Sequence, residues 1–434
     1  FSKIEISKEL GRRQVEVMNV PAQEAFTMAN VPEASEDPLY RLMREYRQDT
    51  NEKKIDLGIG AYRDEHGKPW VLPVVKKAEA LLQTPEFNHE YLPIRGLDSF
   101  LAAAQRLMLG NDSPAIHENR VSSMQTVSGT GAVHLGATFI SCFCRGTERP
   151  KAFISDPTWP NHYQIFSQSE FDVQYYPYYL VETQKIDIKA MIRCLEEAPS
   201  KSLVVLQGCA HNPTGLDPSQ EEWRQIADVM AEKGHFPFFD NAYQGFASGD
   251  LTQDSWACRY FIGRGFECCV AQSFAKNLGM YGERVGAFHY ICSPSPDASH
   301  IADRISSQLA ILQRAHISNP PAYGAHIASR VLNDPKLFAQ WQHELGIMSG
   351  RLTKVRQEIR SKLEARETPG SWAFLSTQIG MFSYTGLSKD QIRLLKSKWH
   401  IYMTENGRIS VAGLNPKNME YFIDAVDDVV RAYP

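Results

Sequence analysis

Lys276 has a setting that an ordinary surface lysine does not need. It follows Ser273 in the segment Gln-Ser-Phe-Ala-Lys-Asn-Leu-Gly, just after the apolar run 268–271, and Arg284 lies a few residues further on. The apolar run is typical of a buried strand, so the chain leads this lysine out of a sheet interior. A lysine that must lose its proton and attack a carbonyl carbon requires such a place. Lys276 is therefore a candidate nucleophile.

Polar residues also follow two other apolar runs. Asn212 follows one run in the segment His-Asn-Pro-Thr-Gly, and Asp240 and Tyr243 follow the next. Taken alone, these residues have simpler interpretations: a turn, a strand-end cap and a packed aromatic ring. In open α/β sheets, however, ligands bind at the carboxyl ends of the strands. We therefore expect all three residues to meet Lys276 at one edge of a sheet.

An anion site is indicated by Ser128, Gly129 and Thr130, which precede a helical pattern. Backbone N–H groups and hydroxyls at a helix N-terminus bind phosphate, although a plain helix cap has the same sequence and no known phosphate-loop motif is present. Trp159 could supply an aromatic face, or belong to the core. A phosphate seat, a carboxylate, a phenol, an aromatic face and an activatable lysine are together what pyridoxal phosphate requires.

The elements that must position these residues form two patterns. From about residue 70 to 345, short apolar runs alternate with amphipathic helices, which favours a largely parallel α/β sheet. After that, a long helix is expected over 341–366, strands over 380–384 and 407–413, and a helix over 418–433. We expect four segments: an N-terminal extension and arm (1–38), an N-terminal part of a small domain (39–69), a large cofactor-binding domain (70–345) and a C-terminal part of the small domain (346–434).

Bulk composition excludes several classes of protein. The 434 residues are 43% hydrophobic and 22% charged, with a net charge of −4, which gives no footprint for nucleic acid or an anionic membrane. No apolar stretch approaches the roughly 20 residues of a spanning helix. Eight cysteines without a C-x-x-C pair are expected to be free thiols, and no metal site is expected. The first residues carry basic charges but no apolar core of a secretory signal.

Six segments occur together in a recognisable order: Glu-Tyr-Leu-Pro-Ile-Arg-Gly, His-Asn-Pro-Thr-Gly, Asp-Asn-Ala-Tyr-Gln-Gly-Phe-Ala-Ser-Gly, Ser-Phe-Ala-Lys-Asn, Ser-Asn-Pro-Pro and Gly-Arg-Ile-Ser-Val-Ala-Gly. With them the chain resembles the aspartate aminotransferase family, within the fold-type I pyridoxal-phosphate enzymes, from about residue 30 to the end. The resemblance implies an α/β fold with a mostly parallel seven-stranded sheet between helices, plus a smaller α+β domain. It also implies transamination of L-aspartate and 2-oxoglutarate to oxaloacetate and L-glutamate.

The resemblance implies roles around the cofactor ring. Lys276 would form the Schiff base with pyridoxal phosphate and then act as the base that moves the substrate proton. Asp240 would pair with the pyridine nitrogen, and His162 would support that carboxylate. Tyr243 and Asn212 would hydrogen-bond the ring oxygen. Trp159 would stack on the ring.

The resemblance also implies which residues bind the phosphate and the substrate. The phosphate would be held by Ser128, Gly129, Thr130, Ser273 and Arg284. Tyr91 would reach it, in a catalytic role, from the neighbouring subunit of a homodimer with shared sites. The α-carboxylate would be bound by Arg408, with Gly60, Asn212 and Trp159 nearby. Arg314 would bind the distal carboxylate from across the dimer, because the guanidinium fork pairs bidentately with carboxylates.

Three positions depart from the family pattern. Ala275 stands where a second serine is usual, which predicts weaker cofactor retention. Ile317 and His316 stand beside the distal arginine, where tryptophan is usual before Ser-Asn-Pro-Pro, so aromatic amino acids are plausible secondary substrates. An aromatic or broad-specificity aminotransferase is thus the alternative. A β-lyase or decarboxylase would not need both Arg314 and Arg408.

Two other classes explain less of the sequence. A nicotinamide-dependent dehydrogenase would use Ser-Gly-Thr-Gly but leave Lys276 and Asp240 without a role. A binding protein on the same scaffold would not need the full catalytic set. We expect a cytoplasmic location, with the mitochondrial matrix as the alternative.

Overall fold

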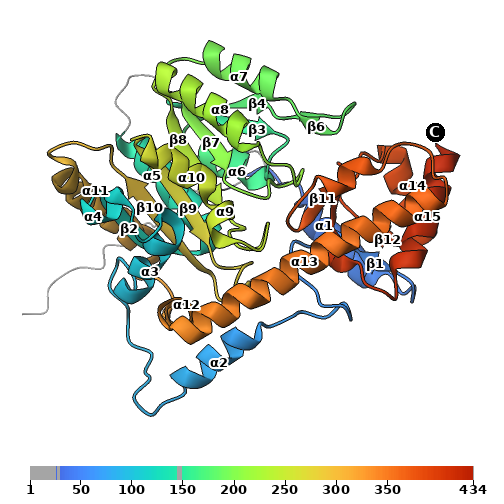
Figure 1. The fold of residues 1–434 in the computed structure, drawn as a ribbon, viewed down its shortest axis with the longest axis horizontal. Helices are drawn as coiled ribbons and strands as arrows, with labels where there is room; N and C mark the ends of the chain where they lie inside the picture. Colours follow the sequence, from blue (N-terminus) through green and yellow to red (C-terminus); the bar gives the residue numbers. More distant parts are fainter. Residues whose placement is uncertain (1–25, 27–29, 144–148, 434) are drawn as a thin grey trace, which may run out of the picture.

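A twisted seven-stranded sheet forms the centre of the large domain in the computed structural model, which describes residues 26, 30–143 and 149–433 (Figure 1). Its strand order is β2-β10-β9-β8-β7-β3-β4, and only β10 runs antiparallel to its neighbours β2 and β9. The predicted mostly parallel α/β fold is confirmed. The strands are β2 (Val121–Val127), β3 (Lys151–Asp156), β4 (Asp172–Pro177), β7 (Leu203–Gln207), β8 (Phe236–Asn241), β9 (Cys268–Ser273) and β10 (Val285–Ile291).

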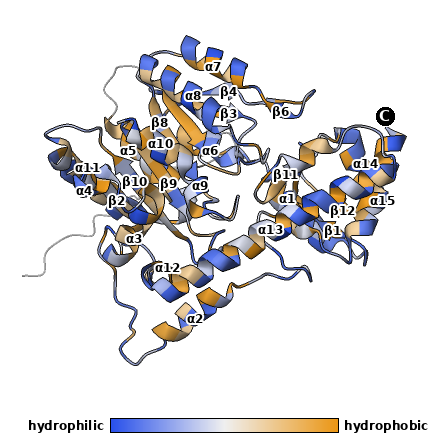
Figure 2. Ribbon diagram, viewed as in Figure 1, coloured by the Kyte–Doolittle hydropathy of each residue, from blue (hydrophilic) through white to orange (hydrophobic). Residues whose placement is uncertain are grey.

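The sheet is buried on both faces, which explains why its central strands read as continuous apolar runs (Figure 2). Successive side chains alternate between the faces: Val205 packs with α5, α6 and α11, whereas Leu206 packs with α7, α8 and α10. Helices of this domain are α2 (Pro73–Leu82), α3 (Asp98–Leu109), α4 (Pro114–His117), α5 (Ser128–Phe143), α6 (Pro160–Gln168), α7 (Ile188–Glu197), α8 (Gln220–Lys233), α9 (Leu251–Asp254), α10 (Trp256–Gly263), α11 (Ala298–Ile317) and α12 (Tyr323–Asn333). The short strands β5 (Tyr179–Leu180) and β6 (Lys185–Ile186) pair with each other.

Helix α8 connects β7 and β8, two strands that carry residues of the site, and capping residues define both of its ends. Ser219 caps its first turn and Glu222 reaches back in a reciprocal capping box. Gly234 ends it in the left-handed conformation that favours glycine. These signals fix where α8 begins and ends, and β8 starts two residues after Gly234 and carries Asp240 to the carboxyl edge.

A smaller α+β unit is built from both ends of the chain. Strand β1 (Ile55–Asp56) pairs with β12 (Ile401–Tyr402), so the segment after α1 (Pro38–Gln48) joins the C-terminal elements. The remaining elements are β11 (Phe382–Tyr384), β13 (Arg408–Ser410), α14 (Lys389–Trp399), α15 (Met419–Ala432) and the short 3₁₀ helices Ala373–Ser376 and Val411–Gly413. The β1–β12 pairing supports the proposed assignment of residues 39–69 to this domain.

Helix α13 (Pro335–Ala365) runs from the sheet domain to the small unit (Figure 1). It starts earlier than the predicted 341–366 because the Asp334 carboxylate accepts hydrogen bonds from the N–H groups of Lys336 and Leu337, with Pro335 at the first helical position. The domain boundary proposed at residue 346 thus lies inside one continuous helix. Strand β13 is also shorter than the predicted 407–413, because the chain turns into a 3₁₀ helix at Val411.

Across the described ranges no helix is long and apolar enough to cross a membrane. The described cysteines, which omit Cys144, are all free thiols, and most of them are buried. No group of three or more metal-ligating side chains gathers within the same ranges.

Candidate active site

A cavity of about 240 Å³ opens at the carboxyl ends of β7 and β8 and at the N-terminus of α5. It brings together eleven of the predicted site residues. They are Gly60, Ser128, Gly129, Thr130, Trp159, Asn212, Asp240, Tyr243, Lys276, Arg284 and Arg408. His162 and Ser273 lie directly behind this lining, where they contact Asp240 and Ser128 respectively. The arrangement follows the rule that ligands of open α/β sheets bind beyond the strand ends.

Lys276 is buried at this cavity, and its pKa lies below the ordinary lysine value. Burial is the main cause, because desolvation disfavours the charged amine; the Arg284 guanidinium acts in the same direction and Asp240 opposes both. The Lys276 Nζ lies 5.2 Å from the centre of the Tyr243 ring. A lysine in this state keeps a larger fraction of neutral, nucleophilic amine than one on the surface.

The Asp240 carboxylate at the end of β8 is held by a hydrogen-bonded chain. Its Oδ2 lies 2.9 Å from His162 Nε2, and His162 Nδ1 lies 2.8 Å from Thr158 Oγ1. His162 is fully buried on α6, and its ring meets that of Trp159 edge-on at 5.2 Å. These hydrogen bonds fix the Asp240 carboxylate in one orientation. A carboxylate that pairs with a cationic ring nitrogen needs to be held in this way.

The N-terminus of α5 forms the anion seat. The Ser128 and Ser273 hydroxyls lie 3.3 Å apart, and Ser273 Oγ also accepts a 3.2 Å hydrogen bond from the Ala275 N–H. A Cβ at Gly129 would lie 3.0 Å from the Ser273 Cβ, closer than ordinary van der Waals contact, so glycine eases the approach of these two segments. Arg284 lines the same cavity, so hydroxyls, helix N–H groups and a guanidinium are available together. This donor set suits a phosphate.

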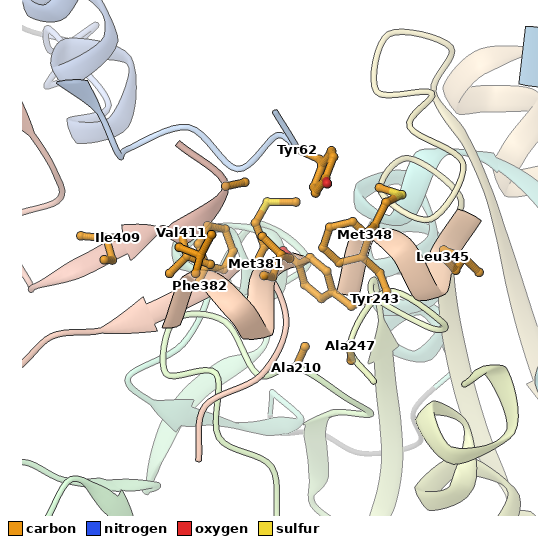
Figure 3. Close-up of a cluster of buried hydrophobic side chains, with 14 of the residues drawn as sticks. Tyr62, Ala210, Tyr243, Ala247, Leu345, Met348, Met381, Phe382, Ile409 and Val411 are labelled. Carbon is orange, nitrogen blue, oxygen red and sulfur yellow. The ribbon is translucent and has the colours of Figure 1, made fainter. Parts of the chain in front are cut away.

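Arg408 on β13 places a buried guanidinium across the cavity. Its Nη2 donates to the Gly58 carbonyl at 2.9 Å, and its Nη1 donates to Asn212 Oδ1 at 3.3 Å. The Phe382 ring centre lies 4.3 Å from the guanidinium carbon, and Phe382 and Tyr243 belong to one buried cluster that joins the two domains (Figure 3). The Arg408 Nε is buried with no hydrogen-bond partner in the described protein. Burial also lowers the pKa of Arg408. A buried guanidinium that lines a cavity is suited to pair with a carboxylate.

Tyr91 and Arg314 lie outside this cavity. Tyr91 is 82% exposed, and Arg314 is exposed at the end of α11, where it donates to Ser318 and, at 3.5 Å, to Asn319 Oδ1. Asn319 in turn donates to the Leu92 carbonyl at 2.8 Å. These hydrogen bonds link the segment that carries Arg314 to the backbone beside Tyr91, and we call the exposed part of these two segments (residues 91, 314 and 318–319) the outer surface.

The three departures from the family pattern have different surroundings. Ala275 is buried in the turn before Lys276. The His316 ring contacts the His134 ring, with centroids 4.9 Å apart, and burial together with His316 lowers the pKa of His134. Ile317 is exposed beside the outer surface.

Sequence reasoning missed four residues of the cavity lining. They are Leu39, Gln207, Ala242 and Phe382. Ala242 lies between Asp240 and Tyr243 in the strand-end segment and could have been found. Gln207 is the last residue of β7, one position past the predicted run, so reading the strand end one residue later would have found it. Leu39 and Phe382 come from segments whose approach to the sheet has no signal in the sequence.

The chain matches the family model described as aminotransferase class I and II over residues 52–426. It is 45% identical to the cytoplasmic aspartate aminotransferase of Schizosaccharomyces pombe over 94% of this chain and 99% of the relative. The solved cytoplasmic aspartate aminotransferase of Saccharomyces cerevisiae superposes with a TM-score of 0.91 at 44% identity, covering 94% of this chain and 99% of that one.

A second solved structure superposes with a TM-score of 0.89 at 36% identity, covering 93% of this chain and 100% of that one. It is the aromatic-amino-acid aminotransferase of Burkholderia pseudomallei covalently bound to pyridoxal phosphate. A family match over most of the chain, and relatives well above 30% identity over nearly their whole length, agree with the cavity described above. The chain belongs to the class I and II aminotransferases.

Proposed function

We propose that this chain is a pyridoxal-phosphate-dependent aspartate aminotransferase, which transfers the amino group of L-aspartate to 2-oxoglutarate in two half-reactions. One observation carries the proposal: the buried amine of Lys276 and the buried guanidinium of Arg408 line the same cavity. An amine in this cavity can attack a carbonyl carbon, and a buried guanidinium that lines it can pair with a carboxylate. An α-amino acid presents its reacting carbon beside its carboxylate. The names of the yeast relatives support aspartate as the substrate.

The side chains of the cavity fit pyridoxal phosphate. The seat of Ser128, Gly129, Thr130 and Ser273 with Arg284 would hold the phosphate, because its hydroxyls, N–H groups and cation match a dianion. Asp240, backed by His162, would hold the ring nitrogen in its protonated form. Tyr243 and Asn212 would donate to the ring oxygen, and Trp159 would cover one ring face.

The residues of this chain divide the work of the reaction. When bound, the cofactor supplies an electron-withdrawing ring that stabilises negative charge developing at the substrate Cα. The Lys276 Nζ takes the proton from that Cα, and its lowered pKa leaves it in the form able to do so. Arg408 fixes the α-carboxylate, with Gly60 and Asn212 beside it, so that the Cα–H bond faces Lys276.

We also propose a homodimer with shared sites, in which Tyr91 and Arg314 serve the partner subunit. Two observations support this: both residues lie outside the cavity of their own chain, and both project from the same outer surface. Arg314 would bind the distal carboxylate of a dicarboxylic amino acid or keto acid, and Tyr91 would contact the cofactor phosphate.

A broad-specificity or aromatic aminotransferase is the second candidate. The observation that favours it is the exposed Ile317 beside the paired rings of His134 and His316, which makes the surroundings of Arg314 unlike a pocket built only for carboxylates. Relative rates on aspartate and phenylalanine decide between the two candidates.

The visible absorption spectrum tests the proposal directly. We expect an absorption band when pyridoxal phosphate is added to the purified chain, and we expect added aspartate to shift this band to shorter wavelength with release of oxaloacetate. A protein that develops no band contradicts the cofactor assignment. A band that aspartate leaves unchanged contradicts the substrate assignment.

We propose a cytoplasmic location, which the names of the two yeast relatives support. The mitochondrial matrix is the alternative. Fractionation of the cells that express the chain, with the enzyme followed by antibody, distinguishes the two compartments.

A further inference from the structure

We infer that Gln207 is a positioning residue for this reaction: its carboxamide holds Asn212, and through Asn212 it sets the orientation of Arg408 and of the donor to the cofactor ring oxygen. The inference rests on the proposed function. It concerns a residue that lines the cavity but was assigned no role above.

The carboxamide of Gln207 binds the backbone of Asn212 on both sides. Its Oε1 accepts the Asn212 N–H at 2.8 Å, and its Nε2 donates to the Asn212 carbonyl at 3.0 Å. Both residues are only 8% exposed, so water does not compete effectively for these bonds. The pair of bonds restrains the two peptide units that flank the Asn212 Cα, which one bond could not do.

Asn212 passes this restraint to the substrate site. Its Oδ1 accepts a hydrogen bond from Arg408 Nη1, and its side chain lines the same cavity. The β7–β8 pairing sets Gln207 beside Asp240 in the sheet register, so the restraint originates on the same rigid strand ends that carry the cofactor groups.

Other contacts hold the loop after β7, but they act on the residues that precede Asn212. The Asp217 carboxylate accepts the N–H groups of Ala210 and His211, at 2.6 and 2.9 Å. The His211 ring binds Ser155 at 2.9 Å and stacks on Tyr178, with ring centroids 3.9 Å apart. These anchors keep the loop folded without Gln207. Loss of the Gln207 carboxamide should therefore loosen Asn212 itself and leave the chain folded.

Gln207→Met tests the inference, because methionine keeps the length of the side chain and removes both hydrogen bonds. We expect the KM for aspartate to rise about three- to tenfold, with a smaller change in kcat, because Arg408 loses a fixed neighbour. We also expect the pH midpoint of the bound cofactor's absorption band to rise by roughly half a unit to one unit, because a loosened Asn212 is a poorer donor to the ring oxygen.

Gln378 offers a matched control variant. Its carboxamide makes the same pair of bonds to a backbone unit, that of Tyr384, with Oε1 accepting at 3.2 Å and Nε2 donating at 3.1 Å, and it lies outside the cavity lining. The buried Arg356 separately holds the carbonyls of Gly380 and Phe382, so this strand keeps its place without Gln378. Gln378→Met should lower the melting temperature of the cofactor-free protein about as much as Gln207→Met, while KM and the absorption midpoint stay at wild-type values.

Gln207→Glu adds a test that survives a poorly folded methionine variant. A protonated glutamic acid can both accept from the Asn212 N–H and donate to its carbonyl, whereas the carboxylate can only accept. The ratio of the variant KM to the wild-type KM should therefore rise with pH. Asp240, Lys276, Arg408 and His162 are present in both proteins, so the carboxyl group at position 207 is the difference between them.

The outcomes separate the inference from the proposed function. Wild-type protein without a cofactor band, or with a band that aspartate does not shift, overturns the proposed function and the inference with it. A normal wild type together with a Gln207→Met variant that behaves like Gln378→Met, with unchanged KM and midpoint, overturns the inference alone. A KM ratio for Gln207→Glu that does not change with pH also overturns it. A raised KM and midpoint confined to the Gln207 variants support it.

Discussion

Arg408 and Arg314 are two arginines of this chain that lie in opposite environments, one buried and one exposed. Arg408 is buried in the cavity, held by Gly58 and Asn212 and covered by the Phe382 ring. Arg314 stands exposed on the outer surface, and its hydrogen bonds go to Ser318 and Asn319, only four and five residues further along the chain. The first guanidinium is fixed before any ligand arrives, whereas the second is fixed only by its local turn.

The difference indicates which carboxylate of a dicarboxylic substrate one subunit could bind by itself. If Arg408 binds the α-carboxylate as proposed, this ion pair forms in a buried site where water neither competes for its hydrogen bonds nor screens its charges effectively. A guanidinium in water gains little from an ion pair, about 0–1 kcal/mol. Arg314 can therefore select a distal carboxylate only if another surface, which we propose is the partner subunit, removes it from solvent.

Lys276→Ala should have the largest effect. Removing the amine removes both the attachment of the cofactor and the base at the substrate Cα, so kcat/KM for aspartate should fall on the order of 10³-fold or more. The coupled release of oxaloacetate measures the rate, and the absorption band should lose its sensitivity to pH. Activity within tenfold of wild type would exclude Lys276 as the base.

Arg408→Ala should follow. Truncating one partner of a buried charge pair costs about 3–5 kcal/mol, which corresponds to roughly 150- to 4,000-fold in kcat/KM. The loss should be equal for aspartate and phenylalanine, because both carry an α-carboxylate. Steady-state kinetics with the two amino acids measure it. A loss confined to aspartate would mean that Arg408 binds the distal carboxylate instead.

Arg314→Ala, unlike Arg408→Ala, should affect the two substrates differently. We expect roughly a 10- to 100-fold loss of kcat/KM for aspartate, and less than a threefold loss for phenylalanine, which has no distal carboxylate. Equal losses on both substrates would remove Arg314 from this role. A large loss on aspartate with little loss on phenylalanine would also show that His316 and Ile317 leave room for an aromatic side chain.

Mixed dimers test whether Arg314 acts in the partner's site. Lys276→Ala and Arg314→Ala chains refolded together in equal amounts form hybrids in which one site carries both defects and the other carries none. About half of the dimers should be hybrids, and each has one intact site, so about a quarter of the wild-type activity on aspartate should return. If the mixture stays as inactive as the separate variants, the two residues act within one chain.

The same contrast explains how far the sequence predicts this molecule. Asp240, Asn212, Ser273 and Lys276 could be placed because each follows an apolar run, and parallel strands end at one edge of their sheet. The approach of Phe382 to Arg408 could not be predicted, since it depends on the antiparallel pairing of β11 with β13 inside the small unit, which the sequence does not reveal. The role of Gln207 could not be predicted from the sequence either, because it arises only when the loop after β7 folds back and places Asn212 beside its carboxamide.

Ala275→Ser should have the smallest effect, and it probes the most local departure of the inner cavity. Ala275 is buried between Ser273 and Lys276, and its N–H already donates to the Ser273 hydroxyl that faces Ser128. A serine hydroxyl there would add one donor at the anion seat, and one such hydrogen bond of about 1 kcal/mol corresponds to a roughly fivefold lower dissociation constant for pyridoxal phosphate. Titration of the cofactor-free protein, followed by the absorption band, measures this constant, and kcat should stay within twofold of wild type. An unchanged or weaker affinity would mean that the side chain of residue 275 does not reach the phosphate, and that this departure has no consequence for cofactor retention.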